Sequence, residues 1–331
     1  MKKIILLFLV ACFVTAAAHA QTVKLLNSGS KASFRGLSVV TDDIVWVSGT
    51  GGTVGRSTDG GNSWTWMTVK GFEKMDFRDI EAFDAKTAVI MGIDAPAYIL
   101  KTTDGGENWN VVFKDTTRGM FLDAMDFSGD ERGIVIGDPI NGNIYLAQTL
   151  DGGNNWREMK VNTFAVDSGE ACFASSGTNI RKLNQSGNIY VTGGKASHVF
   201  VHNEKREIPF VRGTETSGAN SIAFKTAKSF IVVGGDFNKK DNAEKNCFIT
   251  MDAGKTWMTP QSAPHGYRSC VEYLDKESWV CCGLNGVDFS KDGGMNWDWI
   301  SKDGYHAVRK AKKGKAVYFS GGGGRIGKLV Q

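Results

Sequence analysis

The amino-acid sequence predicts an all-β fold, a seven-bladed β-propeller whose ring is closed by the N-terminal strand. Three observations support this prediction. An Asp-Gly-Gly-x-x-Trp element, seen first in STDGGNSW from residue 57, recurs with variations along the chain. Short β-branched and aromatic runs alternate with Gly and Asp, and the 41 glycines suit many tight turns between strands. No segment keeps a helical apolar period over about 11 residues.

The spacing of this element sets the length of the repeating unit. Its aspartates are Asp59, Asp104, Asp151, Asp252 and Asp292. They are 45, 47, 101 and 40 residues apart. A period of about 40–50 residues suits the four short strands of a propeller blade. The gap of 101 residues predicts a blade that has lost the element, with a remnant at 200–207 where His202 and Asn203 replace Asp and Gly.

The predicted strands follow this repeat in chain order. Blades one to three are expected at 36–40, 43–49, 53–57 and 63–67; at 77–83, 87–92, 97–102 and 108–113; and at 121–127, 132–138, 143–149 and 155–159. Blades four to six are expected at 171–175, 188–194 and 198–203; at 220–224, 229–235, 247–251 and 256–260; and at 267–274, 277–283, 286–290 and 296–300. Blade seven is expected at 305–311, 315–322 and 325–331.

The seventh unit ends before a fourth strand, whereas 22–27 is a spare strand ahead of blade one. We therefore expect 22–27 to complete blade seven, which leaves the ring without an open sheet edge. Residues 21–331 are thus predicted to form one domain.

Residues 1–20 have the pattern of a secretory signal peptide. Two lysines precede the apolar run IILLFLVACFV, and the small-x-small sequence AHA ends at Ala20. We expect cleavage near Ala20 and a periplasmic or secreted protein. The alternative is a lipoprotein anchored through Cys12, because LVAC resembles a lipobox.

Composition excludes several classes of partner. The net charge of +4 is spread along the chain, so nucleic acid is not expected. No further apolar run of 18 residues exists, so no transmembrane segment is expected after signal cleavage. No glycine-rich dinucleotide loop opens a helix. We expect a monomer with no cofactor and no metal.

The cysteines left after signal cleavage are odd in number. They are Cys172, Cys247, Cys270, Cys281 and Cys282. We expect buried small hydrophobic side chains, because the spacing is not that of a zinc site. A Cys270–Cys281 or Cys270–Cys282 bridge across neighbouring strands is the alternative.

The recurring element is interpreted as a structural turn between the third and fourth strands of a blade. Its Asp accepts backbone N–H groups, Gly supplies left-handed dihedral angles, and Trp packs between blades. These pairs are Asp59 and Trp64, Asp104 and Trp109, Asp151 and Trp156, Asp252 and Trp257, and Asp292 and Trp297. Calcium binding is a weaker alternative, because one carboxylate per turn supplies too few ligands.

A binding site is expected on the opposite face, where the inner strands enter the channel. Arg35, Arg78, Arg268 and His306 occupy matching positions in four blades. The same face is expected to carry Asn220 and His198 and the acidic residues Asp123, Asp138 and Glu170. A ring of guanidinium groups suits an anionic or protein ligand. Alternatively, the arginines pair with neighbouring acids and stiffen the channel.

The element Ser/Thr-x-Asp-x-Gly-x-x-Trp resembles the Asp-box, or BNR repeat, of sialidases and other propellers. This resemblance implies a glycan-active enzyme as an alternative function, a sialidase-like or other glycoside hydrolase or lyase. Its acids would come from Asp123, Asp138 and Glu170, because glycosidases need paired carboxylates across a cleft. No catalytic residue follows from the sequence.

Segments such as SFRGLSVV, DFRDIEAFD, YILKTTDGG and GIVIGDPI resemble the propellers related to photosystem II stability and assembly factors. The resemblance covers nearly the whole chain after the signal. It implies a seven-bladed assembly factor that binds partner proteins, in a secreted bacterial relative. The arginine patch implicated in that family would correspond here to Arg35, Arg78 and Arg268. An envelope protein is therefore the expected partner, with a glycan as the alternative.

Overall fold

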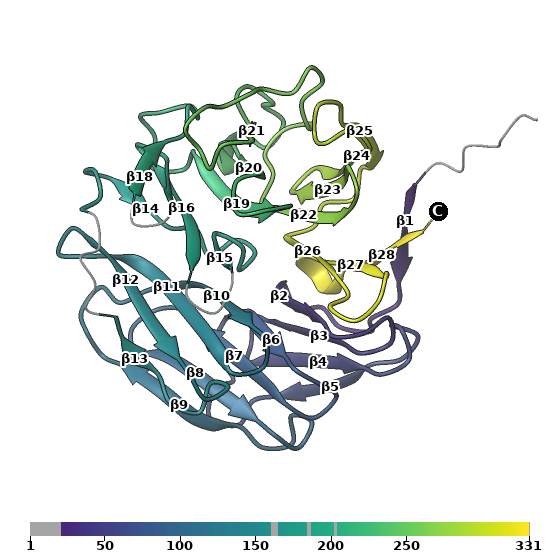
Figure 1. Ribbon diagram of the computed structural model, residues 1–331. Helices are drawn as coiled ribbons and strands as arrows, with labels where there is room; N and C mark the ends of the chain where they lie inside the picture. The colour runs from purple at the N-terminus through teal and green to yellow at the C-terminus, as the bar shows by residue number, and fades with distance from the viewer. Residues whose placement is uncertain (1–20, 160–164, 184–186, 202–203, 331) are drawn as a thin grey trace, which may run out of the picture.

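The computed structural model describes residues 21–159, 165–183, 187–201 and 204–330. Its strands form seven antiparallel sheets arranged around a central channel, with neighbouring strands of each sheet mostly consecutive in the chain (Figure 1). The predicted all-β, seven-bladed propeller is confirmed. The predicted signal peptide and its alternative at Cys12 lie outside the described residues.

The first three blades each contain four strands. Their strands are β2 (Phe34–Val39), β3 (Val45–Gly49), β4 (Thr53–Ser57) and β5 (Thr65–Thr68); β6 (Phe77–Ala82), β7 (Ala88–Gly92), β8 (Ala97–Thr102) and β9 (Asn110–Asp115); and β10 (Leu122–Ser128), β11 (Arg132–Ile140), β12 (Asn143–Thr149) and β13 (Arg157–Glu158).

Blades four to seven are less uniform. Their strands are β14 (Glu170–Ala171), β15 (Ile180–Lys182), β16 (Asn188–Gly194), β17 (His198–Val201) and β18 (Glu204–Glu207); β19 (Ala219–Phe224), β20 (Phe230–Gly234) and β21 (Cys247–Thr250); β22 (Cys270–Asp275), β23 (Ser278–Gly283), β24 (Gly286–Ser290) and β25 (Asp298–Ser301); and β26 (Ala307–Lys310), β27 (Val317–Ser320), β28 (Ile326–Val330) and β1 (Thr22–Leu26). Two short 3₁₀ turns, η1 (Phe237–Lys239) and η2 (Gly322–Gly324), lie between strands.

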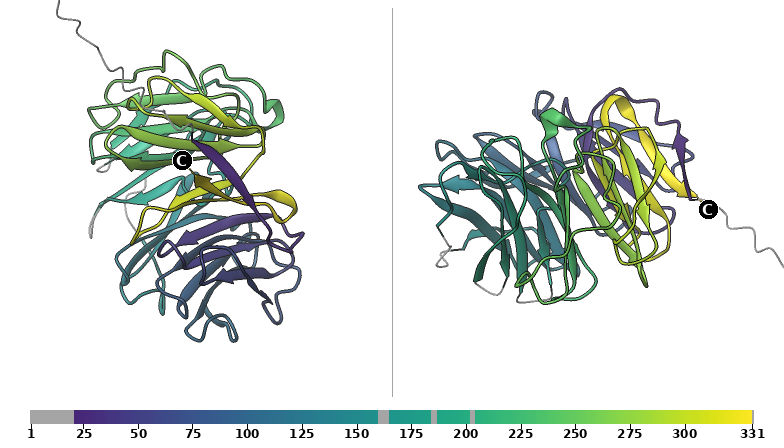
Figure 2. Two further views of the ribbon diagram at one scale, coloured as in Figure 1. Left: turned by 90° about the vertical axis from the view of Figure 1, so that its right-hand side faces the viewer. Right: turned by 90° about the horizontal axis from the view of Figure 1, so that it is seen from above.

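The two ends of the chain close the ring. Strand β1 pairs antiparallel with β28, from Thr22 opposite Val330 to Leu26 opposite Ile326. Figure 2 shows the N-terminal strand lying against the C-terminal one. The pairing converts two edge strands into one complete blade, as the sequence predicts.

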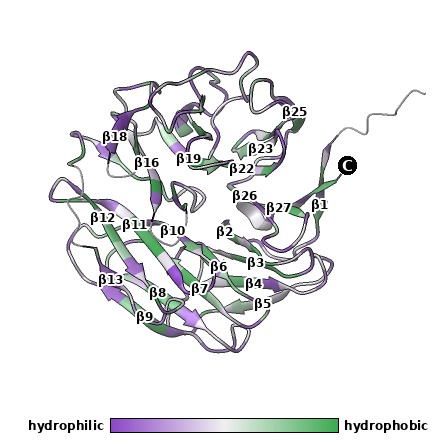
Figure 3. Cartoon of the chain, viewed as in Figure 1, coloured by the Kyte–Doolittle hydropathy of each residue, from purple (hydrophilic) through white to green (hydrophobic). Residues whose placement is uncertain are grey.

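Blade junctions hold the hydrophobic core. Buried apolar side chains of the described residues form seven clusters, one at each junction between neighbouring blades. Figure 3 shows hydrophobic residues concentrated in the strands and hydrophilic ones in the connecting loops. Among the described residues, no helix is long and apolar enough to cross a membrane.

Two predicted strands differ in the structure. The expected inner strand at 171–175 is instead split into β14 and β15, because residues 172–179 leave the sheet. The expected strand at 256–260 is reduced to one bridge between Ile249 and Met258. The proposed box remnant at 202–203 lies outside the described residues, between β17 and β18, which pair directly.

The recurring element is a hydrogen-bonded turn in all five copies. In the first, the Ser57 hydroxyl donates to the Asp59 carboxylate at 2.8 Å, and the Ser63 N–H donates to the same oxygen at 2.9 Å. The matching carboxylates Asp104, Asp151, Asp252 and Asp292 accept the equivalent bonds. Each carboxylate is thus engaged by its own turn, which supports the structural interpretation.

The second glycine of each element joins neighbouring blades. A Cβ at Gly106 would lie 2.5 Å from the sulfur of Met67 in blade one, and a Cβ at Gly153 would lie 2.9 Å from Val89 in blade two. The element therefore packs its backbone directly onto the preceding blade, where a larger residue has no room.

These carboxylates predict acid sensitivity. Hydrogen bonds from the residue four positions later lower the pKa of Asp59, Asp104 and Asp252 to about 2. Because the folded pKa lies below the unfolded value, this stabilisation is complete above about pH 4 and is lost as the pH falls toward 2. We expect the Tm to fall over this range, and the triple Asp→Asn variant to show a shallower fall in scanning calorimetry.

The control is a triple Asp→Asn variant of the exposed residues Asp130, Asp298 and Asp303, which should keep the wild-type slope. Equal slopes for the wild type and the box variant would show that the turns do not carry this pH dependence.

Candidate functional site

A cavity of about 420 Å³ lies at the channel mouth where the inner strands begin. Its lining residues are Arg35, Arg78, Phe121, Asp123, Asp138, Ala171, Cys172, Phe173, Ala174, Ser175, Asn220, Phe237, Tyr267, Ser269, Leu284 and His306. In each blade this mouth lies at the opposite strand ends from the Asp-Gly-Gly-x-x-Trp turns, because successive strands run antiparallel.

A repeated β-bulge directs side chains into this cavity. The register shifts at the second residue of the inner strand in four blades, at Arg35, Arg78, Asp123 and Asn220. A bulge adds one unpaired residue and changes the direction of its side chain. Equivalent positions in separate blades therefore supply two guanidinium groups, a carboxyl group and an amide to one space.

The two arginines differ in their partners. The Arg78 Nε donates to an Asp76 carboxylate oxygen at 2.8 Å, and both side chains are partly exposed. Among the described residues, the half-buried Arg35 guanidinium makes no hydrogen bond or ion pair. Burial lowers the pKa of Arg35, and the like charge of Arg78 lowers it further. The charge of Asp76 opposes this effect, but Asp76 is itself paired with Arg78, so Arg35 is a partly desolvated cation without a direct ion pair.

An acidic pair lies in the same cavity. Asp123 is fully buried, and neither of its carboxyl oxygens has a hydrogen bond of normal geometry with a described residue. Burial raises the pKa of Asp123 well above its usual range, and Asp138 raises it further, against the opposing effects of Arg78 and the Ala174 backbone. Asp138 accepts the Cys172 N–H at 2.9 Å, and burial raises its pKa as well.

His306 is held neutral in this site. Burial, followed by the charges of Arg35 and Arg78, lowers the pKa of His306 to about 3. Its Nε2 lies 3.3 Å from the Ser33 hydroxyl, while its Nδ1 is buried without a hydrogen-bond partner among the described residues. His306 therefore adds a polar group and no charge at neutral pH.

Hydrogen bonds and ring contacts connect the Asn220 amide with the aromatic residues of the cavity wall. The Asn220 oxygen accepts the Tyr267 hydroxyl at 2.8 Å and the Ser175 hydroxyl at 3.0 Å. Phe237 makes edge contacts with Tyr267 and Phe173, with ring centroids 6.3 and 5.9 Å apart. The sequence did not identify these aromatic residues as part of a site, because they lie outside the strands and belong to no repeated motif.

Residues 172–179 close the channel below the cavity. This segment lies at the centre of the ring between β14 and β15 (Figure 1). The Arg309 guanidinium of blade seven donates to the Ser176 carbonyl at 2.8 Å, and the Ser176 hydroxyl donates to the Ser269 carbonyl of blade six at 2.7 Å. A Cβ at Gly177 would lie 2.3 Å from the Asp79 carboxylate of blade two. We call residues 172–179 the plug.

A second cavity, of about 380 Å³, is lined by Arg309 and by charged residues further along the channel. Five of its charged residues form ion pairs: Arg181 contacts Asp126 and Glu272, and Lys312 contacts Glu81. We therefore place the candidate site in the first cavity.

Arg268 does not line the cavity. Its guanidinium is fully buried, where it forms an ion pair with the buried Asp288 and donates to the Asn285 oxygen at 2.6 Å. Arg268 precedes β22, which begins at Cys270, and its neighbours Tyr267 and Ser269 line the cavity whereas Arg268 does not. The expected convergence of three arginines is thus reduced to Arg35 and Arg78.

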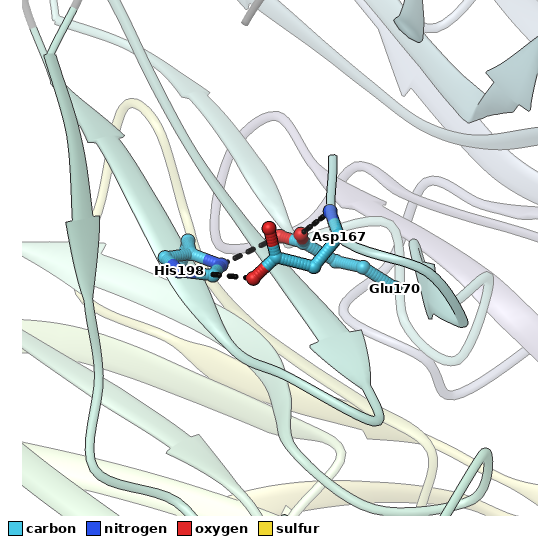
Figure 4. Close-up of side chains that lie close together, drawn as sticks. All are labelled: Asp167, Glu170 and His198. Carbon is cyan, nitrogen blue, oxygen red and sulfur yellow. Dashed lines mark hydrogen bonds and ion pairs between the residues drawn. The ribbon is translucent and has the colours of Figure 1, made fainter. Parts of the chain in front are cut away.

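Glu170 and His198 belong to a separate cluster with Asp167 (Figure 4). The His198 Nδ1 lies 2.9 Å from Glu170, and the Lys205 ammonium lies 3.2 Å from Glu170 and 3.1 Å from Asp167. Burial alone would raise the pKa of Glu170, but hydrogen bonds from His198 and Thr192 lower it to about 2. The three side chains have the spacing of a metal site, but the Lys205 ammonium already contacts both carboxylates.

The five cysteines among the described residues are free thiols, and all five are buried. Cys270 and Cys282 are register partners on β22 and β23 without a bridge between them.

Comparisons with known proteins place this geometry in context. Residues 65–206 match the family model described as photosynthesis system II assembly factor YCF48. No curated protein sequence matches the chain. A structure described as YCF48 bound to D1 peptide is similar, with a TM-score of 0.68 and 16% identity, covering 95% of this chain and 97% of that one.

Two further solved structures share the fold. YCF48 from Cyanidioschyzon merolae has a TM-score of 0.62 and 17% identity, covering 93% of this chain and 98% of that one. The WD40 β-propeller domain of Doa1 has a TM-score of 0.63 and 12% identity, covering 95% and 98% respectively. At these identities the structures show the propeller fold alone.

The isolated Asp123 carboxyl group predicts a stability gain on substitution. Because its folded pKa lies above the unfolded value, wild-type stability falls as the pH rises from about 4. We expect Asp123→Asn to raise the free energy of unfolding at pH 8 by roughly 1–3 kcal/mol, because a neutral amide avoids the cost of burying or protonating a carboxyl group that is ionised in the unfolded chain, and by less near pH 4. Denaturant unfolding measures both values.

The exposed Asp298→Asn is the control and should leave stability unchanged at both pH values. A variant less stable than the wild type at pH 8 would mean that Asp123 has a stabilising partner.

Proposed function

We propose that this chain, a photosystem II assembly factor-like β-propeller, is a non-enzymatic binding protein that holds a segment of a partner protein over the cavity mouth. The main support for the proposal is the Arg35 guanidinium, which forms no direct ion pair. It lies beside Arg78 in the lining of a cavity whose inner end is closed by the plug. A guanidinium group without a direct ion pair favours a carboxylate or another anionic group of a ligand.

The mouth also offers apolar contact area. Phe237 and Leu284 line the cavity while remaining 37% and 40% exposed. Exposed aromatic and aliphatic side chains beside arginine are typical of the centre of a protein interface. One of the similar propellers is described as bound to a peptide, which supports a peptide segment as the ligand class.

The location of this binding outside the cytoplasm is part of the proposal. It is supported by the basic, apolar and small-residue pattern of residues 1–20. An exported propeller would meet envelope proteins, and these are the partners we propose.

The glycan-active alternative has less support. Its three candidate acids do not form one group, because Glu170 is bound to His198, Thr192 and Lys205 outside the cavity. Asp123 and Asp138 remain together, but Asp123 is fully buried.

A capture experiment tests the proposal. The full chain is immobilised and exposed to the envelope fraction of its native cells, and retained proteins are quantified by mass spectrometry. We expect the Arg35→Ala/Arg78→Ala variant to lose the main retained protein by about tenfold or more, equivalent to roughly 1.4 kcal/mol or more of binding free energy.

The matched control is Arg157→Ala/Lys255→Ala, which removes the same charge from exposed positions outside the cavity and should retain the partner. Equal capture by the cavity variant, or equal loss by the control, would contradict a site at Arg35 and Arg78.

A further inference from the structure

The cavity wall contains two groups of opposite charge type that lack partners. Arg35 makes no hydrogen bond or ion pair with a described residue, and neither Asp123 oxygen has a hydrogen bond of normal geometry with one. The neighbouring polar groups are satisfied, since Asn220 binds Tyr267 and Ser175. Buried polar groups are rarely left unpaired in folded proteins, so each isolated group requires an explanation.

The fold keeps these groups from neutralising each other. Arg35 lies on β2 of blade one and Asp123 on β10 of blade three, and each is directed by its own bulge. No ion pair joins Asp123 to Arg35 or Arg78 among the described residues. A ligand that carries both an anion and a cation satisfies both ends of the cavity.

The acidic end favours an ammonium group. Asp138 lies close enough to Asp123 to raise the pKa of that carboxyl group. Two neighbouring carboxyl groups form an unfavourable pair when both are ionised, and an inserted cation removes this repulsion. Arg35 at the other end, next to Arg78, favours a carboxylate.

The apolar part of the cavity wall and the volume of the cavity define the remaining features of the ligand. Phe121, Phe173 and Phe237 supply an apolar surface. The plug closes the inner end of the cavity, whose volume is about 420 Å³. Such a volume is at the small end for ligand pockets. It suits a small molecule with an apolar side chain.

We propose that the cavity binds a small zwitterion with an apolar side chain, of the amino acid and dipeptide class. Its carboxylate contacts Arg35, and its ammonium group lies between Asp123 and Asp138. This site does not depend on capture of a partner protein, so either proposal can fail without the other.

Binding is coupled to proton release. In the empty cavity burial and Asp138 raise the pKa of Asp123 and so favour its protonated form, while Arg78 and the Ala174 backbone oppose this rise. His306 faces the same space as a neutral ring, since burial and the two arginines lower its pKa to about 3. An incoming ammonium group replaces the Asp123 proton, which passes to solvent. Affinity should therefore rise between pH 5 and pH 8.

Isothermal titration of the full chain with L-phenylalanyl-L-leucine and with L-phenylalanine tests the proposal. We expect binding by at least one of these probes at millimolar concentration or below. For the probe that binds, N-acetylation and C-amidation should each weaken affinity by about tenfold or more, because each removes one charged contact. The heat should also vary with the ionisation enthalpy of the buffer, which reports proton release.

Two variants identify which residue contacts the amino group of the ligand and which contacts its carboxylate. Asp123→Asn should abolish the preference for a free over an acetylated amino group, and Arg35→Gln should abolish the preference for a free over an amidated carboxylate. Asp298→Asn and Arg157→Gln, both exposed and outside the cavity, are the matched controls and should keep both preferences. Circular dichroism verifies that all four variants fold.

Several results would overturn the site. They are no binding of either probe by the wild type, equal binding of capped and uncapped forms, or unchanged preferences in the folded Asp123 and Arg35 variants.

Discussion

The antiparallel pairing of β1 with β28 is the contact on which the remaining architecture depends. By joining the two ends of the chain, it completes the seventh sheet and makes the inner strands converge on one axis. Convergence brings residues that are distant in sequence, such as Arg35, Asp123 and His306, to a single mouth. Without closure, blades one and seven would expose sheet edges and the channel would have no continuous wall.

The two faces of the ring have different structural roles. At one end of each blade, the repeated Asp turns use their carboxylates locally and pack their glycines against the preceding blade. At the other end, bulges in four blades leave one residue of the inner strand free of the ladder and direct it into the channel. The plug then converts an open channel into a blind cavity, held by Arg309 through the Ser176 carbonyl.

Much of the fold could be predicted because its signals are local. The Asp turns give the period, and the spare N-terminal strand predicts ring closure. Arg35 and Arg78 could be found from their repeated position in FRG and FRD. Arg268 was placed wrongly at the cavity because its burial depends on an ion pair with Asp288, which lies on β24 and is distant in the sequence. The plug could not be predicted either, since its contacts come from distant blades.

The central claim is that ligands bind at the plugged mouth of the channel and not at the Asp turns. Hydrogen–deuterium exchange of the protein with and without its bound ligand tests it most directly, because protection maps contact along the backbone. The account predicts protection around Arg35, Arg78 and Phe237–Lys239, with the Asp turns unchanged. Protection confined to the Asp turns at residues 57–64, 102–109 or 250–257 would contradict it.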